Sequence, residues 1–424
     1  GGYCTSFTRQ GYRFDVGVHY LGGVKVGILG KILEELNLKN KIKFNRFDPT
    51  DKIVMPENTT YIRTDYHDTV KEFKKSFPME AGNIDFFFKF ISDQNFANIY
   101  IKTKELTFKN VLDEFFKDYR IKATLGILLN NLGLSPARAS ASASLILFKE
   151  FILDTGYYPE GGMGNFANIL AGQFKEFSGE LILNKKVESI LVKKQKVEGV
   201  LLSTGERVAS DFVVSNADAT QTFKELVKKP TVEAGLLKEL TPSLSLFVLY
   251  LGVDIPVDNE NCNIWRSKSY EVDKYFSKLD DNIRSFNISF FMLSFPSEHD
   301  SVVRLSNKKV AQIYLISPYL SKDFWDKNRD ILSDKVIDEV ENSGISLKDK
   351  IKIKLTAIPH TFYRYTLNSR GSAFGWESTV EQIKSQRFPQ NTSIDGLYLA
   401  GHWCMVGSGQ GGIPKVAFSG KKAS

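Results

Sequence analysis

Residues 396–420, GLYLAGHWCMVGSGQGGIPKVAFSG, decide the fold of this chain. A short apolar run, LYLA, leads into a glycine-packed turn, and the turn opens what we expect to be a helix. The turn holds five glycines, at positions 401, 407, 409, 411 and 412. Because glycine has no Cβ atom, a flat ring or a phosphate can approach the main chain there. Backbone N–H groups at the helix N-terminus then favour an electron-rich or anionic ligand group.

The middle of the chain has the pattern of an α/β protein. Four β-prone runs follow one another: ELILN (180–184), KVESILV (186–192), VEGVLLS (197–203) and DFVVSNA (211–217). The last run is apolar at 212–214, which is typical of a buried parallel strand that ends at a ligand crevice. Before these runs, Gly161, Gly162 and Gly164 precede a helix predicted over 165–176. Alternating helix and strand predicts an α/β fold.

Two further regions have different patterns. The pattern of residues 65–155 is mostly helical. Ser135 as the N-cap and Pro136 as the first helical residue predict a helix that runs to about Leu153. Residues 244–317 contain three long β-prone runs, SLFVLYLGV, FNISFFMLSF and VAQIYLIS. We expect these runs to form a sheet that makes one wall of a cavity.

Composition excludes several classes of function. Lys and Arg exceed Asp and Glu by 56 − 49 = 7, but the basic residues are scattered, so we expect no nucleic-acid partner. The net positive charge instead favours weak attraction to an anionic membrane surface. The three cysteines, Cys4, Cys262 and Cys404, have no CxxC spacing, which indicates neither disulfides nor a metal site and fits a reducing cytoplasm. No 18-residue apolar window predicts a membrane span.

Five motifs occur in a specific order along the chain. They are GGYCTSFTRQGYRFDVGVHYLGG (1–23), YYPEGGMGNFANIL (157–170), VESILVKKQKVEGVLLSTGERVASDFVVSNAD (187–218), HTFYRYTLNSRGSAFGWE (360–377) and the glycine segment 396–420. In this order they resemble the FAD-dependent phytoene-desaturase-like oxidoreductases, a family that includes carotenoid isomerases and retinol saturases. The resemblance extends over the whole chain.

This resemblance implies a split Rossmann-type FAD-binding domain interleaved with an α+β substrate domain. We assign 1–50, 157–230 and 390–424 to the FAD-binding domain. Residues 51–156 form the helical part of the substrate domain or a lid, and 231–389 form its sheet part. The family carries a GxGxxG segment and an acidic residue near its N-terminus, and neither is present here. We therefore expect the chain to be N-terminally truncated, with the first βαβ unit largely missing.

The resemblance also implies which N-terminal residues contact FAD. Gly1 and Gly2 match a glycine pair beside the flavin ribityl chain. Tyr3 stands where many relatives have arginine, so a charged contact is not expected there. Asp15, Gly17 and His19 belong to the FDxGxH segment beside the isoalloxazine ring.

Later motifs complete the implied cofactor site. Val187 matches a strand residue at the adenine edge, and Asn216 matches the end of the predicted buried strand. Gly401 precedes a position that is commonly aspartate and is here His402. Gly411, Gly412 and Ile413 match the helix start under the pyrimidine end of the flavin, where N–H groups stabilise the anionic reduced ring.

Several residues have two possible interpretations. Asp15 is either a cofactor residue or a turn residue that caps N–H groups, and His19 and His402 are either functional or structural histidines. Cys404 is interpreted as apolar filler. The candidate catalytic residues are His19, Arg364 and Tyr365, and the last two are either on the substrate side or an ordinary surface pair. The aromatic residues of 84–116 form either core or an isoprenoid channel.

The sequence thus predicts an FAD-dependent desaturase, saturase or isomerase that acts on a long apolar isoprenoid, carotenoid or retinoid-like molecule by hydride transfer at flavin N5. The first alternative is a flavin amine oxidase. The second is a non-catalytic relic or fragment that keeps only the scaffold. The expected location is the cytoplasm, with peripheral association with a membrane as an option.

Overall fold

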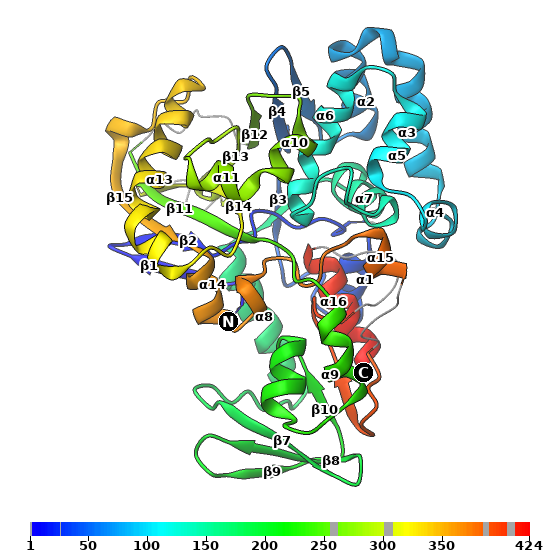
Figure 1. The fold of residues 1–424 in the computed structure, drawn as a ribbon, viewed down its shortest axis with the longest axis vertical. Helices are drawn as coiled ribbons and strands as arrows, with labels where there is room; N and C mark the ends of the chain where they lie inside the picture. Colours follow the sequence, from blue (N-terminus) through cyan, green and yellow to red (C-terminus); the bar gives the residue numbers. More distant parts are fainter. Residues whose placement is uncertain (1, 26, 255–261, 301–307, 385–389, 405–411) are drawn as a thin grey trace.

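A computed structural model describes residues 2–25, 27–254, 262–300, 308–384, 390–404 and 412–424. In Figure 1 a large sheet and a group of helices make the upper part of the molecule, and a smaller set of strands and helices makes the lower part. Segments from the beginning, middle and end of the chain meet in the lower part, so both parts are assembled from sequence-distant pieces.

The upper part is built on a seven-stranded sheet in the order β15-β11-β14-β13-β12-β4-β5. Its strands are β4 (Asp51–Val54), β5 (Thr59–Ile62), β11 (Ser245–Val253), β12 (Asn263–Ser267), β13 (Phe290–Ser294), β14 (Lys309–Ser317) and β15 (Ile351–Ala357). Neighbours pair antiparallel except β12 and β4, which are parallel. Every residue of β11 and β14 is buried, which explains why these runs lack a polar face. The three predicted β-prone runs are confirmed.

The predicted boundary between the helical part and the sheet part of the substrate domain differs from the observed one. The large sheet includes β4 and β5, which the sequence-based boundary at residue 51 places with the helices. These strands join the sheet because β4 pairs with β12 in register from Asp51↔Asn263. A strand pair so distant in sequence leaves no local pattern.

The helices predicted within 65–155 are present beside this sheet (Figure 1). They are α2 (Tyr66–Ser76), α3 (Ala81–Asp93), α4 (Phe96–Thr103), α5 (Phe108–Phe115), α6 (Tyr119–Gly126) and α7 (Ala141–Phe148). Phe87, Phe88, Phe108 and Phe116 are at most 1% exposed and belong to the main hydrophobic core, whereas Phe86 is 69% exposed. Most of this aromatic region is therefore core.

The single helix predicted from Ser135 to about Leu153 is wrong. Residues 136–138 form a turn, α7 begins after Ser140, and the chain continues as the π-helical segment η3 (Lys149–Leu153). Two tertiary hydrogen bonds interrupt the helix: Ser140 N donates to Ser378 O at 2.8 Å, and Ala141 N donates to Leu106 O at 2.9 Å. These bonds outweigh the local capping signal, because they satisfy N–H groups that a helix leaves unpaired.

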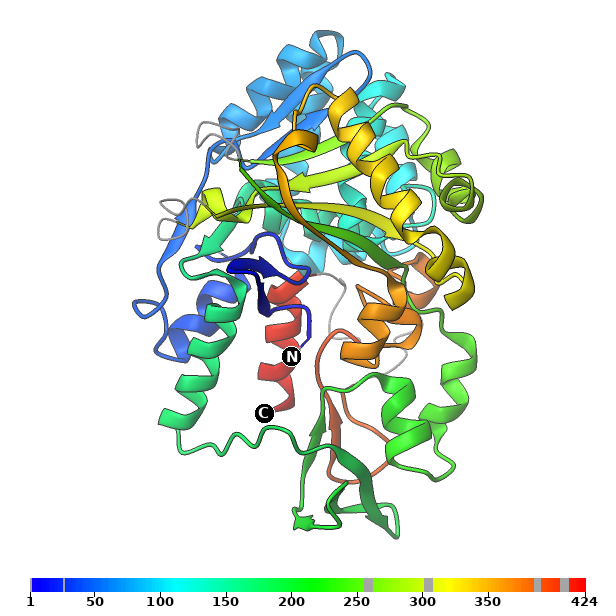
Figure 2. The same ribbon diagram turned by 90° about the vertical axis from the view of Figure 1, so that its left-hand side faces the viewer.

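The lower part carries the glycine-rich turn. The strand β16 (Leu397–Leu399) lies parallel to β10 (Val213–Ser215), and α16 (Gly412–Ala423) follows the turn. The helix α16 packs against α1 (Ile28–Glu35), and α8 (Gly162–Glu176) stands nearby (Figure 2). A separate antiparallel sheet contains β7 (Val187–Lys193), β8 (Lys196–Leu202) and β9 (Arg207–Ala209). The predicted strand–turn–helix order of 396–420 is confirmed for its strand and its helix.

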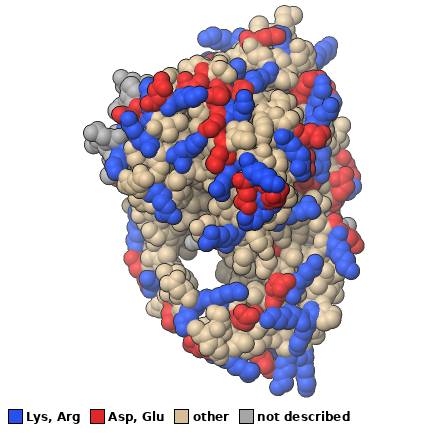
Figure 3. Space-filling model, turned by 60° about the vertical axis from the view of Figure 1, so that its left-hand side comes forward, with Lys and Arg blue, Asp and Glu red and all other residues tan. Residues whose placement is uncertain are grey.

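Two predictions about this part are wrong. The run ELILN forms no strand, and Leu181, Ile182 and Leu183 are 42%, 50% and 70% exposed. The strand β10 is not buried either, since Phe212 beside it is 65% exposed and Val214 is 50% exposed. In the described parts of the chain β10 pairs with β16 alone, so both strands of this pair are edge strands. Figure 3 shows an opening through this lower part.

The remaining strands and helices are distributed over both parts. They are the hairpin β1 (Ser6–Arg9) with β2 (Tyr12–Asp15), the pair β3 (Phe44–Arg46) with β6 (Tyr157–Pro159), and the helices α9 (Val232–Leu236), α10 (Val272–Ser277), α11 (Leu279–Arg284), α12 (Pro296–His299), α13 (Lys322–Asn342), α14 (Pro359–Thr366) and α15 (Val380–Lys384). None of the helices described is both long and apolar enough to cross a bilayer. The face drawn in Figure 3 intersperses acidic and basic side chains.

Candidate functional site

A cavity of about 480 Å³ lies where the N-terminal segment, the end of α7, the segment after α14 and the start of α16 meet. Its size falls within the range of small-molecule and cofactor sites. The described residues that line it are Gly2, Tyr3, Cys4, Gly17, Val18, His19, Tyr20, Leu21, Asn131, Leu147, Phe151, Asn216, Leu246, Tyr365, Thr366, Asn368, Ala373, Phe374, His402, Cys404, Gly412, Ile413, Pro414, Lys415 and Val416.

Three of the predicted glycines lie on the cavity wall. Gly2 has open space where its Cβ would be, and its φ is +78°. A Cβ at Gly17 would lie 3.1 Å from the Tyr3 ring, and one at Gly412, where φ is +67°, would lie 3.2 Å from Phe151. These positions therefore present bare main chain to whatever occupies the cavity. Gly1 and Gly411 lie outside the described residues.

Tyr3 is a neutral hydrogen-bonding residue of this wall. Its hydroxyl donates to Ser372 O at 2.8 Å and approaches Gly371 O at 3.1 Å. Burial raises the pKa of this phenol far above its ordinary value. Its ring lies 5.4 Å from the Phe362 ring and 6.4 Å from the His402 ring. Where many relatives are expected to have arginine, this chain therefore has an uncharged ring held by two carbonyl groups.

His402 is held by Asn368, a residue that the sequence reasoning did not single out. The Asn368 amide nitrogen lies 3.3 Å from His402 Nε2, and its Oδ1 accepts a hydrogen bond from Trp403 Nε1 at 3.0 Å. Burial lowers the pKa of His402 to about 4, so its imidazole is neutral near pH 7. Asn368 lies inside the motif HTFYRYTLNSRG, and its place in that motif could have marked it as a site residue.

His19 also lines the cavity and is also neutral. Burial lowers its pKa to about 3. Its ring lies 4.5 Å from the Tyr20 ring and 6.0 Å from the Trp265 ring. A neutral imidazole can accept or donate a hydrogen bond here, but it does not supply a positive charge near pH 7.

Asp15 does not line the cavity; the protein itself satisfies its carboxylate. Oδ1 accepts hydrogen bonds from Ser6 Oγ at 2.5 Å and Met163 N at 3.2 Å, and Oδ2 accepts one from Tyr158 at 2.5 Å. Asp300 Oδ2 accepts a hydrogen bond from Gly161 N at 3.0 Å in the same turn. Two carboxylates thus occupy the N-terminus of α8, so this glycine turn is closed to a phosphate.

Of the remaining predicted site residues, some line the cavity and others do not. Asn216 and Ile413 line the cavity, and Gly401 adjoins it through Asn216. Val187 begins β7 and is not among the lining residues. Tyr365 lines the cavity yet is 71% exposed, which places it at the opening.

Arg364 does not line the cavity. Its guanidinium lies 5.6 Å from the centre of the exposed Tyr365 ring. It is therefore a surface partner of Tyr365 rather than a cavity residue.

The lining also contains a cation that was not anticipated. Lys415, in the first turn of α16, faces the cavity, and burial lowers its pKa to about 7. Within the described ranges, neither Asp nor Glu is among the lining residues. The described residues also contain no group of three or more His, Cys, Asp or Glu side chains placed to hold a metal ion.

The family model of flavin-containing amine oxidoreductases matches residues 1–424. This chain belongs to that family. It is accordingly an FAD-dependent oxidoreductase, and the phytoene-desaturase-like resemblance is confirmed.

Curated relatives of this flavin oxidoreductase act in carotenoid chemistry. It is 24% identical to the chloroplastic prolycopene isomerase of Daucus carota, over 99% of this chain and 73% of the relative. It is 22% identical to a 4,4'-diapophytoene desaturase of Methylomonas sp, over 96% and 85% of the two chains. It is also 22% identical to a 4,4'-diaponeurosporene oxygenase of Staphylococcus aureus, over 75% of this chain and 64% of the relative.

Solved structures share the fold of the flavin oxidoreductase. An oxidoreductase from Methanosarcina mazei superposes with a TM-score of 0.69 at 14% identity, covering 100% of this chain and 91% of the other. Wild-type putrescine oxidase bound to putrescine superposes with a TM-score of 0.64 at 12% identity, covering 100% and 90%. These similarities confirm the mixed α/β architecture.

The cavity fits the flavin of this family. Gly2, Gly17 and Gly412 leave room for a flat ring, and the start of α16 offers N–H groups to its electron-rich edge. His402 and Asn216 also line the cavity and would offer neutral polar atoms to a bound flavin. When bound, FAD supplies the acceptor or donor of a hydride. The role of each residue toward FAD remains a prediction from the family motifs.

Proposed function

We propose that this flavin oxidoreductase acts on a long apolar isoprenoid, carotenoid or retinoid-like substrate, as a desaturase, saturase or isomerase with hydride transfer at flavin N5. The observation that carries this proposal is the chemistry of the cavity. Its described lining includes Tyr20, Leu147, Leu246 and Phe374 but no carboxylate. An apolar chain is stabilised by such walls, because binding removes apolar surface from water.

The same lining disfavours the alternative of amine oxidation. A primary amine or polyamine arrives as an ammonium ion, and burial of an ammonium ion without an anion is costly. Here Lys415 would add a like charge. The family name and the putrescine oxidase fold favour amine oxidation, so amines are the necessary comparison.

In this function the residues of the chain bind and orient the substrate rather than supply acid–base groups. Leu147, Leu246 and Phe374 would pack against the apolar chain and exclude water. Tyr3 and His402 stay uncharged near pH 7 because burial favours their neutral forms.

The test uses FAD-saturated protein under anaerobic conditions. A long isoprenoid or polyene should reduce the flavin, reoxidise it after photoreduction, or change its own double-bond geometry while the flavin is reduced. Primary amines and polyamines should leave the flavin spectrum unchanged. Rapid flavin bleaching by an amine, with no response to any polyene, would establish the amine oxidase alternative.

Matched variants link the activity to the cavity. Ala373 lines the cavity, whereas Ala209 is an exposed residue of β9. Ala373→Phe should therefore slow the polyene reaction at least tenfold, because the added ring fills substrate space. Ala209→Phe should have no effect on the rate. Equal rates in the two variants would place the substrate elsewhere.

A further inference from the structure

Lys415 and Glu150 come from distant parts of the sequence and lie close enough beside the cavity for their charges to interact. Lys415 lies in the first turn of α16. The segment η3 packs against the same turn, since a Cβ at Gly412 would lie 3.2 Å from Phe151 Cζ. Glu150, the neighbour of Phe151, is only 8% exposed. A cation and an acid are thus held on the two sides of one packed contact.

The two groups influence each other's charge. Burial lowers the pKa of Lys415 to about 7, and attraction to Cys404 and Glu150 opposes this shift. Burial raises the pKa of Glu150 to about 7; the charge of Lys415 opposes this rise, and repulsion from Asp154 adds to it. Near pH 7 small changes in the surroundings therefore decide where the proton resides.

No other described charge neutralises Lys415. Among the described residues, no carboxylate forms an ion pair with it within 4 Å. Asp154 accepts a hydrogen bond from Lys25 N at 3.0 Å. On α1, which packs against α16, Glu35 pairs with Lys421, toward the other end of α16.

An ammonium at this place needs an anion in the cavity. The N-terminal turn of a helix carries a partial positive charge, so a lysine there is repelled by the helix dipole. The described lining has no Asp or Glu to compensate. The family's flavin becomes anionic when it accepts two electrons and one proton, and so it can supply the missing charge.

We propose that Lys415 carries the positive charge that balances the reduced flavin, and that Glu150 is a positioning residue that tunes this charge. When the flavin takes up two electrons and one proton, Lys415 Nζ takes up one further proton from solvent. The external reductant provides both electrons. This proposal rests on the FAD of the family and is independent of the substrate class.

The reduction potential of the FAD-saturated full chain, measured against pH, tests the proposal. The slope counts the protons taken up per two electrons. Above about pH 7 the native chain should show the slope for two protons, and Lys415→Met should show half that slope and a lower potential. Lys415→Arg keeps a permanent charge, so it should restore the potential but keep the half slope. Lys421→Met is the matched control from the same helix and should behave as the native chain.

A second measurement does not require the flavin. Lysine side-chain NMR of the flavin-free chain should show one amine that titrates near pH 7 and is missing in Lys415→Met. In Glu150→Gln this amine should titrate at lower pH, because an attractive negative charge is removed.

Three results would overturn the proposal: a native slope of one proton, a two-proton slope that persists in Lys415→Met, or a Lys415 that titrates like a surface lysine. Oxidation of amines would instead overturn the proposed substrate and leave these expectations unchanged.

Discussion

Asn216 Oδ1 lies 2.0 Å from the position that a Cβ atom would occupy at Gly401, a residue whose φ is +91°. Asn216 follows β10 and Gly401 follows β16, so this contact joins the ends of the two parallel strands. Gly401 N also donates to Ser419 Oγ of α16 at 2.7 Å. The strand ends and the last helix are therefore held together at the edge of the cavity by a residue that must be glycine.

Gly401→Ala should lower the free energy of unfolding by about 1–2 kcal/mol, because a Cβ is disfavoured in the left-handed backbone conformation of Gly401 and would push the Asn216 side chain aside. Urea unfolding measures this loss. Gly420→Ala is the control, since nothing lies within 4 Å of its Cβ position in α16. This control should be neutral or stabilising by up to about 1 kcal/mol. Equal unfolding midpoints for the two variants would contradict the expectation.

Gly412→Val should abolish flavin retention. A branched side chain at φ +67° would press on Phe151 and displace the start of α16 from the ring site. The measurement is flavin absorbance per protein after gel filtration of the FAD-saturated chain. Gly172→Ala in α8, where a Cβ meets nothing within 4 Å, is the control. Normal flavin content in Gly412→Val would reduce this turn to a purely structural one.

Asp15→Ala should destabilise the fold without removing the flavin site. The change leaves Ser6, Tyr158 and Met163 N without their acceptor, which costs about 2–4 kcal/mol. Because Asp15 does not line the cavity, the flavin content of the folded fraction should stay the same. Loss of flavin at unchanged stability would restore Asp15 as a cofactor residue.

The stability of the protein should pass through a minimum near pH 7 because of Glu150 and Lys415. The folded state binds a proton at Glu150 between its ordinary pKa of 4.5 and about 7, so the free energy of unfolding falls as pH rises there. The unfolded state keeps a proton on Lys415 between about 7 and 10.5, so the free energy of unfolding rises with pH in that window.

Urea unfolding at about pH 5, 7 and 9 checks this dependence. The double variant Glu150→Gln, Lys415→Met should remove a dip on the order of 2 kcal/mol. If the native chain and the double variant have parallel profiles, the two groups titrate in the folded state as they do in the unfolded state.

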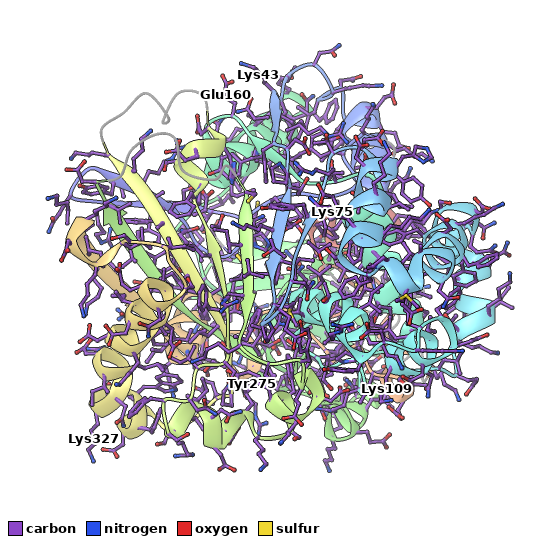
Figure 4. The ribbon with its side chains drawn as sticks, turned by 90° about the horizontal axis from the view of Figure 1, so that it is seen from above. Lys43, Lys75, Lys109, Glu160, Tyr275 and Lys327 are labelled. Atoms are coloured by element: carbon purple, nitrogen blue, oxygen red, sulfur yellow. The ribbon has the colours of Figure 1, made fainter. Side chains whose placement is uncertain are left out.

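We propose that the protein works in the cytoplasm at the surface of a membrane. Met79, Phe86 and Ile101 of the helical part are 94%, 69% and 68% exposed. Figure 4 shows Lys75 and Lys109 on the helical side of the molecule, away from Lys327 of α13, and Lys102 follows Ile101 directly in the chain. Exposed apolar side chains with nearby lysines favour docking on an anionic bilayer.

Sedimentation with anionic liposomes measures this docking. Binding should be strong at low salt and partly lost at high salt, because salt screens the lysines but not the apolar contact. Phe86→Ser with Ile101→Ser should weaken binding at least fivefold, and Ile331→Ser on α13, 48% exposed in the native chain, should not. Binding that is insensitive to the helical-side variants would locate the contact elsewhere.

The sequence by itself determined the family, the strand and helix that flank the glycine turn, and the strands β11 and β14. These features are readable because each depends on local order: a glycine turn between a strand and a helix, or an apolar run as long as one strand. The motif order also identified Gly2, Tyr3, Gly17 and His402 as positions of one site, and all four line the cavity.

Only the tertiary structure decided how these positions behave. The expected helix start at Ser135 is replaced by hydrogen bonds to Ser378 and Leu106, and burial makes His19 and His402 neutral. The charge interaction between Lys415 and Glu150 likewise depends on the packing of α16 against η3. Burial, charge and hydrogen bonding at a site depend on groups that are distant along the chain, and no local pattern records which of them will meet.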